Sequence, residues 1–145
     1  MPVDVTTAVV IARPCDQVAA YAGDPGNAPE WYANITSVRW QTPPPVGVGS
    51  RIDFVARFLG RTLAYTYEVI EYGPRQLVMR TAQGPFPMET TYQWQPEGER
   101  STRMTLRNRG EPVGFGKVAA PVMARAIRRA NEKDLARLKQ VLESS

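Results

Sequence analysis

Histidine is absent from this 145-residue sequence, and cysteine occurs once, at Cys15. Histidine is the commonest general base, metal ligand and catalytic-triad member, so its absence disfavours metal-dependent and triad chemistry. Cys15 cannot form an internal disulfide and has no histidine to activate it, so we expect a small, buried or half-buried residue there. The glycines are scattered and form no phosphate-cradling loop. The sequence therefore predicts neither a metal site nor a cofactor.

Long hydrophobic runs are also missing, and so is an N-terminal targeting pattern. The apolar runs are only a few residues long, far short of a membrane span, and residues 1–7 lack the basic start and apolar core of a signal peptide. Together with the single cysteine, this predicts a cytoplasmic protein. Since 43% of the residues are hydrophobic, we expect one globular domain covering residues 1–145.

The net charge of +4 is concentrated at the C-terminal end. Residues 116–145 carry three acidic side chains against seven basic ones, namely Lys117, Arg125, Arg128, Arg129, Lys133, Arg137 and Lys139. Such a basic face can meet phosphates or an acidic membrane, or it can simply be solvated. No nucleic-acid-binding motif accompanies the charge, so we expect neither a nucleic-acid partner nor stable membrane association.

The same segment, residues 116–145, has the clearest helical periodicity. With Ile127 as reference and about 100° per residue, one stripe holds Ala120, Met123, Ala130, Asp134, Leu138 and Val141, with Asn131 and Leu142 at its edge. The pattern predicts an amphipathic helix of about 25 residues. Pro121 is expected to mark its first turn or to bend it.

Short alternating segments precede this helix. A first strand is predicted over residues 3–11, followed by two short helices over residues 15–21 and 28–33. Six more strands are predicted within residues 35–41, 52–58, 63–69, 77–79, 88–94 and 104–106. Turn signals about every ten to twelve residues are typical of an antiparallel sheet. The order predicts an α+β fold in which about seven strands wrap one long helix.

Four motifs in this order resemble the helix-grip fold of the START/polyketide-cyclase (SRPBCC) superfamily, in particular its polyketide cyclase/dehydrase-type members. They are Val9-x-Ile11-x-x-Pro14-x-x-x-Val18-x-x-Tyr21, Asp24-x-x-Asn27-x-Pro29-x-Trp31, Gly47-x-Gly49, and Leu135-x-x-Leu138-Lys139-x-x-Leu142-Glu143. The resemblance implies a curved antiparallel sheet around the long helix, with a ligand cavity between them. It does not imply one chemistry, because members include lipid carriers, hormone-binding proteins and aromatase/cyclases.

Aromatic and methionine side chains supply the candidate ligand contacts. They share the apolar face of successive strands or the facing stripe of the helix, where they either pack as core or line a cavity. The predicted ligand-binding residues are Phe54, Phe58, Tyr65, Tyr67, Met79, Phe86, Tyr92, Trp94, Met104, Met123, Ile127 and Asn131. Residues 84–87 and 109–116 are either cavity-mouth loops or simply a hairpin turn and the lead-in to the helix.

Asp134 lies near the centre of the apolar helix stripe. A buried carboxylate must be paired, hydrogen-bonded or protonated. One interpretation leaves Asp134 half solvated at the sheet edge, or paired with a strand arginine such as Arg80 or Arg107. The other makes it a cavity acid that binds or protonates a ligand carbonyl, and on that interpretation it is the one candidate catalytic residue.

Three functions remain open. The first is binding of a small hydrophobic or aromatic molecule, lipid or polyketide-like, without chemistry. The second is a polyketide cyclase or dehydratase that uses the same cavity and needs a buried titratable group there. The third is an interaction or membrane-surface module that uses the basic helix face and has no sizeable cavity. The sequence allows a monomer or a homodimer.

Overall fold

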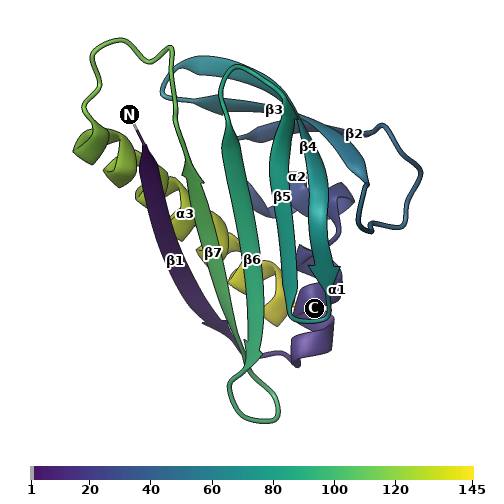
Figure 1. The fold of residues 1–145 in the computed structure, drawn as a ribbon. Helices are drawn as coiled ribbons and strands as arrows, with labels where there is room; N and C mark the ends of the chain where they lie inside the picture. Colours follow the sequence, from purple (N-terminus) through teal and green to yellow (C-terminus); the bar gives the residue numbers. More distant parts are fainter. Residues whose placement is uncertain (1) are drawn as a thin grey trace.

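The computed structural model describes residues 2–145, which form one antiparallel sheet packed on a long helix (Figure 1). Seven strands lie within these residues: β1 (Val3–Ile11), β2 (Ile35–Trp40), β3 (Arg51–Phe58), β4 (Arg61–Gly73), β5 (Gln76–Gln83), β6 (Met88–Pro96) and β7 (Thr102–Gly110). Their order in the sheet is β1-β7-β6-β5-β4-β3-β2. This is the α+β arrangement that the sequence predicts.

The pairing of β1 with β7 joins strands about a hundred residues apart in the chain. Their register runs without interruption from Val3 opposite Gly110 to Ile11 opposite Thr102. The next strand in the chain, β2, lies at the opposite edge of the sheet, so the segment between β1 and β2 must cross from one edge to the other. The sheet curves around α3 (Figure 1).

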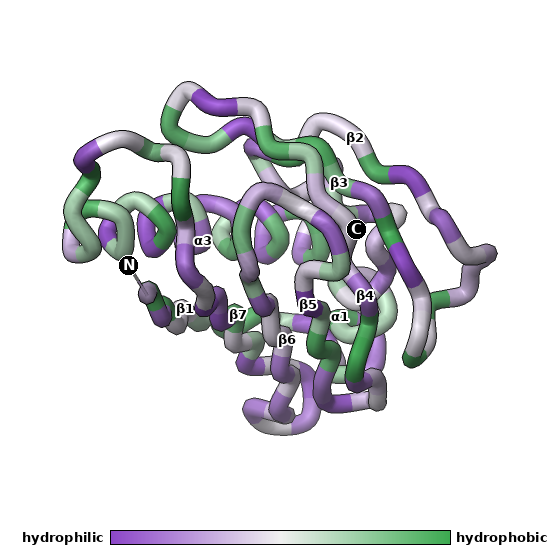
Figure 2. The backbone as a smooth tube through the Cα atoms, turned by 45° about the horizontal axis from the view of Figure 1, so that its top comes forward, coloured by the Kyte–Doolittle hydropathy of each residue, from purple (hydrophilic) through white to green (hydrophobic). Residues whose placement is uncertain are grey.

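Helix α3 (Ala120–Glu143) lies against the concave face of the sheet (Figure 1). Pro121 occupies the first turn, where its missing N–H costs nothing, as the sequence predicts. Green and purple segments alternate along the helix in Figure 2, as an amphipathic pattern requires. Its buried stripe consists of Met123, Ile127, Asn131, Asp134, Leu135, Leu138 and Leu142. The concave face of the sheet therefore packs on the long helix.

Two short helices link β1 to β2. Helix α1 (Cys15–Ala22) and helix α2 (Ala28–Trp31) flank a 3-10 turn (Pro25–Asn27), and the Asp24 side chain accepts a hydrogen bond of 2.9 Å from the Gly26 N–H there. Helix α2 is shorter than the predicted 28–33, because the chain becomes extended at Tyr32. Trp31 is wholly buried, with its ring centroid 4.3 Å from that of Tyr32.

The free edge of β1 is covered by side chains from α3. Arg128 donates to the Thr6 carbonyl at 3.0 Å, and Lys139 donates to the Val10 carbonyl at 2.9 Å. Glu143 accepts from the Ala12 N–H at 2.8 Å. These contacts satisfy part of an edge that could otherwise pair with another strand. Part of the basic helix face therefore has a structural role.

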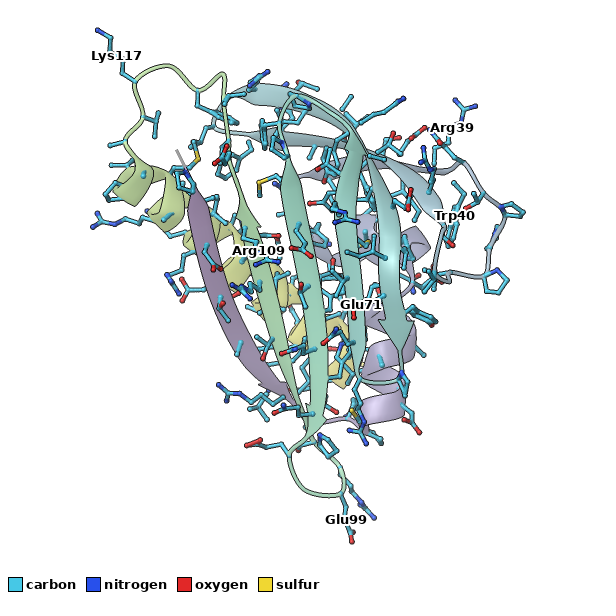
Figure 3. All side chains as sticks on the ribbon, viewed as in Figure 1. Arg39, Trp40, Glu71, Glu99, Arg109 and Lys117 are labelled. Atoms are coloured by element: carbon cyan, nitrogen blue, oxygen red, sulfur yellow. The ribbon has the colours of Figure 1, made fainter. Side chains whose placement is uncertain are left out.

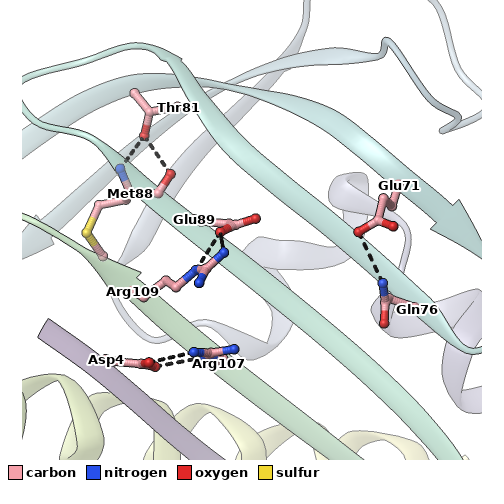
Figure 4. Close-up of polar contacts among 8 residues, drawn as sticks. All are labelled: Asp4, Glu71, Gln76, Thr81, Met88, Glu89, Arg107 and Arg109. Carbon is pink, nitrogen blue, oxygen red and sulfur yellow. Dashed lines mark hydrogen bonds and ion pairs between the residues drawn. The ribbon is translucent and has the colours of Figure 1, made fainter.

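The outer face of the sheet is polar. Arg109 and Glu71 project from it on the side away from α3 (Figure 3). Ion pairs join Arg107 to Asp4 and Arg109 to Glu89 across neighbouring strands (Figure 4). Such exposed pairs contribute little stability individually. Within residues 2–145, no helix combines the length and apolar character needed to cross a membrane.

Candidate functional site

A cavity of about 140 Å³ lies between the concave face of the sheet and α3. Its walls come from strands β3 to β7, from α3, from the segment around α2, and from the loops before β6 and before α3. The lining includes the side chains of Tyr32, Asn34, Phe54, Phe58, Tyr65, Tyr67, Met79, Phe86, Thr90, Tyr92, Asn108, Phe115, Ile127, Asn131 and Asp134. The cavity is thus mainly apolar and aromatic, with a few polar groups.

One wall is a packed group of aromatic rings. The centroid of Phe54 lies 5.5 Å from that of Tyr65 and 5.9 Å from that of Tyr67, and the two tyrosine rings are 5.0 Å apart. These residues face the same side because side chains alternate along β3 and β4, which pair in register. The result is a continuous aromatic surface on this side of the cavity.

Most of the predicted ligand-binding residues line this cavity. They are Phe54, Phe58, Tyr65, Tyr67, Met79, Phe86, Tyr92, Ile127 and Asn131. Whether any of them contacts a ligand stays a prediction.

Trp94, Met104 and Met123 do not line the cavity, so the prediction that places them in it is wrong. Trp94 and Met104 are at most 1% exposed and pack together in the main core, where the indole N–H donates to the Met104 sulfur at 3.2 Å. Met123 belongs to a separate cluster with Val3 and Val5. Alternation along a strand identifies the inward face, but it does not tell which part of that face is filled by core.

A chain of hydrogen bonds crosses the cavity wall from sheet to helix. The Tyr67 hydroxyl and Thr90 Oγ1 are 2.8 Å apart, Thr90 donates to Asn108 Oδ1 at 2.7 Å, and Asn108 Nδ2 donates to Asn131 Oδ1 at 3.2 Å. A threonine hydroxyl has one proton, and since Thr90 gives it to Asn108, Tyr67 donates to Thr90. Burial, the largest cause, raises the pKa of Tyr67 to about 12, so its hydroxyl keeps its proton.

Thr90 and Asn108 were not predicted from the sequence. Both are polar residues at inward positions, since Thr90 alternates with Tyr92 and Trp94 on β6, and Asn108 alternates with Met104 and Leu106 on β7. A polar residue within an inward series was the available signal.

Asp134 is 2% exposed and lines the cavity. Its Oδ1 accepts a hydrogen bond of 3.0 Å from the Ala33 N–H. Burial raises its pKa to about 6, against the lowering effect of that hydrogen bond. The suggested pairing with Arg80 or Arg107 is wrong: Arg107 pairs with Asp4 on the outer face, and Arg80 is exposed.

Two tyrosine hydroxyls meet beside Asp134. The Tyr32 and Tyr92 oxygens are 2.5 Å apart, and burial raises the pKa of both well above the usual value. Both therefore remain neutral hydrogen-bonding groups. Tyr32 was missed from the sequence because it follows α2, where no periodicity fixes its direction.

Three lining phenylalanines, Phe58 at the end of β3 and Phe86 and Phe115 in two loops, meet at one side of the cavity. The Phe115 centroid lies 5.8 Å from that of Phe58 and 5.9 Å from that of Phe86. The Arg61 guanidinium lies 5.4 Å from the Phe115 centroid and donates to the Val113 carbonyl at 2.7 Å. Segments 84–87 and 109–116 thus both contribute to the cavity lining, and their role as its mouth stays a prediction.

Metal ligands do not gather in the part of the chain that the structure describes. No group of three or more His, Cys, Asp or Glu side chains is placed to hold an ion within residues 2–145. Cys15 is half-buried at the start of α1, where Arg75 donates to its sulfur at 3.2 Å.

A comparison with known protein families agrees with this fold. A family model described as polyketide cyclase / dehydrase and lipid transport matches residues 2–143. The chain belongs to this family. No curated protein matches the sequence.

Several solved structures share the fold of this chain, a member of the polyketide cyclase / dehydrase and lipid transport family. A START superfamily protein from Mycobacterium smegmatis has a TM-score of 0.85 at 18% identity, with 97% of each chain covered. A protein from Thermus thermophilus has a TM-score of 0.84 at 22% identity, with 99% of each chain covered. The Zhui aromatase/cyclase from Streptomyces sp. R1128 has a TM-score of 0.79 at 17% identity, covering 99% of this chain and 94% of that one. At such identities the similarity establishes the helix-grip fold of the START/SRPBCC superfamily.

Proposed function

We propose that this protein binds a small hydrophobic or aromatic molecule in the cavity between the sheet and α3. The observation that carries the proposal is the cavity itself, with an aromatic wall and a few converging polar groups, which is the usual composition of a ligand site. The family description, which includes lipid transport, agrees with it.

The volume limits the ligand. A cavity of roughly 150 Å³ in another protein accommodates benzene. The 140 Å³ here therefore suits one aromatic ring with a small substituent. A longer polyketide-like or lipid chain would extend through the mouth between Phe58, Phe86 and Phe115.

Native mass spectrometry of the purified protein tests the proposal directly. We expect a co-purifying apolar molecule that is released on denaturation, or uptake of a hydrophobic fluorescent probe by the empty protein.

A matched pair of variants on α3 assigns such binding to the cavity. Ala130 lines the cavity and Ala136 is exposed on the outer side of the helix. We expect Ala130→Phe to abolish binding and Ala136→Phe to leave it unchanged. Equal binding by both variants would place the ligand elsewhere and contradict the proposal.

A cyclase or dehydratase using the same cavity is the second candidate. The observation that favours it is Asp134, a cavity carboxyl whose pKa is raised to about 6 and which can therefore exchange a proton near neutrality. On this hypothesis Asp134→Asn abolishes turnover of a cyclisable polyketide mimic while preserving its affinity. Turnover that survives the substitution would remove Asp134 from the chemistry.

The third candidate, an interaction or membrane-surface module, loses support. It required the absence of a sizeable cavity and a free basic helix face. Arg128 and Lys139 instead bind carbonyls of β1, and Arg137 donates to the Glu30 carbonyl at 2.7 Å.

A further inference from the structure

The charge of the cavity lining narrows the ligand class. The chain contains fifteen arginines and three lysines. Among the described residues that line the cavity, however, there is no arginine and no lysine. Asp134 is the one charged residue among them. An anionic ligand would enter without a counter-charge and beside a carboxylate, and an unpaired buried charge is costly.

The hydrogen-bond chain leaves one donor free toward the cavity. Asn131 is 3% exposed, and its Oδ1 is occupied by Asn108. Its Nδ2 is buried and has no partner within the protein. Buried polar atoms are normally satisfied, so an amide donor left free at a cavity wall is complementary to an acceptor oxygen on a ligand.

A free acceptor lies in the same region. Asn34 Oδ1 is also buried without a partner and lines the cavity. Asn34 follows Ala33, whose N–H binds Asp134, and Asp134 is one helical turn from Asn131. The charge of Asp134 also acts on the hydroxyls of Tyr32 and Tyr92, which burial keeps neutral. Lys133, its neighbour on α3, acts to lower the pKa of Asp134, but its side chain is exposed and does not line the cavity. This end of the cavity is polar without carrying positive charge.

We infer that the ligand is an uncharged molecule with a ring-sized apolar body and a carbonyl oxygen that accepts from Asn131 Nδ2, and that Asp134 excludes carboxylates. The inference rests on the proposed function, since it specifies the ligand of the same cavity. It separates this protein from carriers of free fatty acids and of other anionic ligands.

Three probes of nearly equal size and shape test it: acetophenone, ethylbenzene and benzoate. Their dissociation constants are measured by calorimetry in mildly alkaline buffer, where Asp134 is ionised. Acetophenone carries the acceptor, ethylbenzene lacks it, and benzoate adds the charge. We expect benzoate to bind at least about a hundredfold more weakly than acetophenone.

The variant Asn131→Leu removes the donor and keeps a similar volume. We expect it to weaken acetophenone binding at least about fivefold, since the carbonyl is left without a partner, and to leave ethylbenzene binding unchanged or tighter. Unchanged ethylbenzene binding also shows that the variant is folded. Asn131→Ser replaces it if the leucine variant does not fold, because serine is too short to reach the same oxygen.

The variant Asp134→Asn tests the charge. We expect the gap between acetophenone and benzoate to shrink at least about fivefold, since one of the two repelling charges is removed.

The outcomes distinguish the two proposals. Binding of none of the probes, ethylbenzene included, would overturn the proposed function. If ethylbenzene binds, two results would overturn this inference alone. One is benzoate binding as tightly as acetophenone. The other is an Asn131→Leu substitution that weakens the binding of neither acetophenone nor ethylbenzene, or of both equally.

Discussion

At the residue scale, Asp134 combines a buried position with a titratable group. A buried acid that meets only one backbone donor is held less favourably when ionised than when protonated. Its cost to the fold should therefore depend on pH, and the direction follows from the raised pKa.

Asp134→Asn should stabilise the protein above pH 6. Because the folded pKa is raised from 3.8 to about 6, the native state holds the proton more tightly than the unfolded chain does. The resulting stability is fully present below pH 3.8 and is lost as the pH rises through about 6. The asparagine variant, which does not titrate and keeps an oxygen for the Ala33 N–H, should exceed the wild type by at most about 3 kcal/mol above that pH.

Urea unfolding across this pH range measures the difference between the two proteins. Glu132→Gln, on an exposed side chain of the same helix, serves as the control and should follow the wild-type profile. A constant difference between Asp134→Asn and the wild type at every pH would show that the carboxyl is solvated rather than buried.

At the element scale, the apolar stripe of α3 borders both the main core and the cavity. Leu138 is wholly enclosed in the main core, whereas Ile127 borders the cavity. Leu138→Ala should cost about 2–5 kcal/mol of unfolding free energy. Ile127→Ala should fall at the lower end of that range and enlarge the cavity, because its side chain already faces empty space.

Thermal and urea unfolding give the two free energies, and the apolar-probe capacity reports the cavity. Equal costs for the two variants, or a cost below about 0.5 kcal/mol for either, would contradict the assigned stripe.

The cover that α3 places over the edge of β1 gives a second element-scale prediction. Removing both Arg128 and Lys139 by alanine substitution exposes the carbonyls of Thr6 and Val10, so we expect self-association with a loss of about 1 kcal/mol or less in stability. Light scattering at increasing concentration measures it.

The control variant replaces Arg125 and Arg129, exposed bases of the same helix, and removes an equal charge. Association by the control to the same extent would assign the effect to net charge instead of the strand edge.

At the scale of the whole molecule, the end of β3 and the loops before β6 and before α3 meet through the rings of Phe58, Phe86 and Phe115. Under the proposed function, we expect the ligand to enter between them. Arg61 links the start of β4 to the loop before α3 through Val113 and Phe115. Arg61→Ala should speed both association and release of an aromatic probe in stopped-flow measurements, with a stability change below about 1 kcal/mol. Arg57→Ala, on the exposed side of the same hairpin, is the matched control. Identical rates for the two variants would show that the mouth does not limit exchange.

The local pattern of apolar and polar residues determined most of the secondary structure and the order of its elements. Alternation predicted the strands, the 3.6-residue period predicted α3, and the order of elements indicated the helix-grip fold. These features follow from each residue's neighbours along the chain, so the sequence alone contains them. The buried stripe of α3 was predicted only in part, because Leu135 was missed and Ala120, Ala130 and Val141 are half-buried. The same patterns placed eight of the predicted residues on the cavity wall, and Phe86 from segment 84–87 is the ninth, although their contact with a ligand remains a prediction.

Only the tertiary structure decided which inward positions are core and which are cavity. Trp94 and Phe54 read alike in an alternating strand, yet one is packed against Met104 and the other borders open space. The polar chain from Tyr67 to Asn131 joins three strands and a helix, and the partner of Asp134 is a backbone N–H about a hundred residues away. Such contacts depend on the pairing of β1 with β7 and on the path of α3 across the sheet. The positions of these residues along the chain do not predict such contacts.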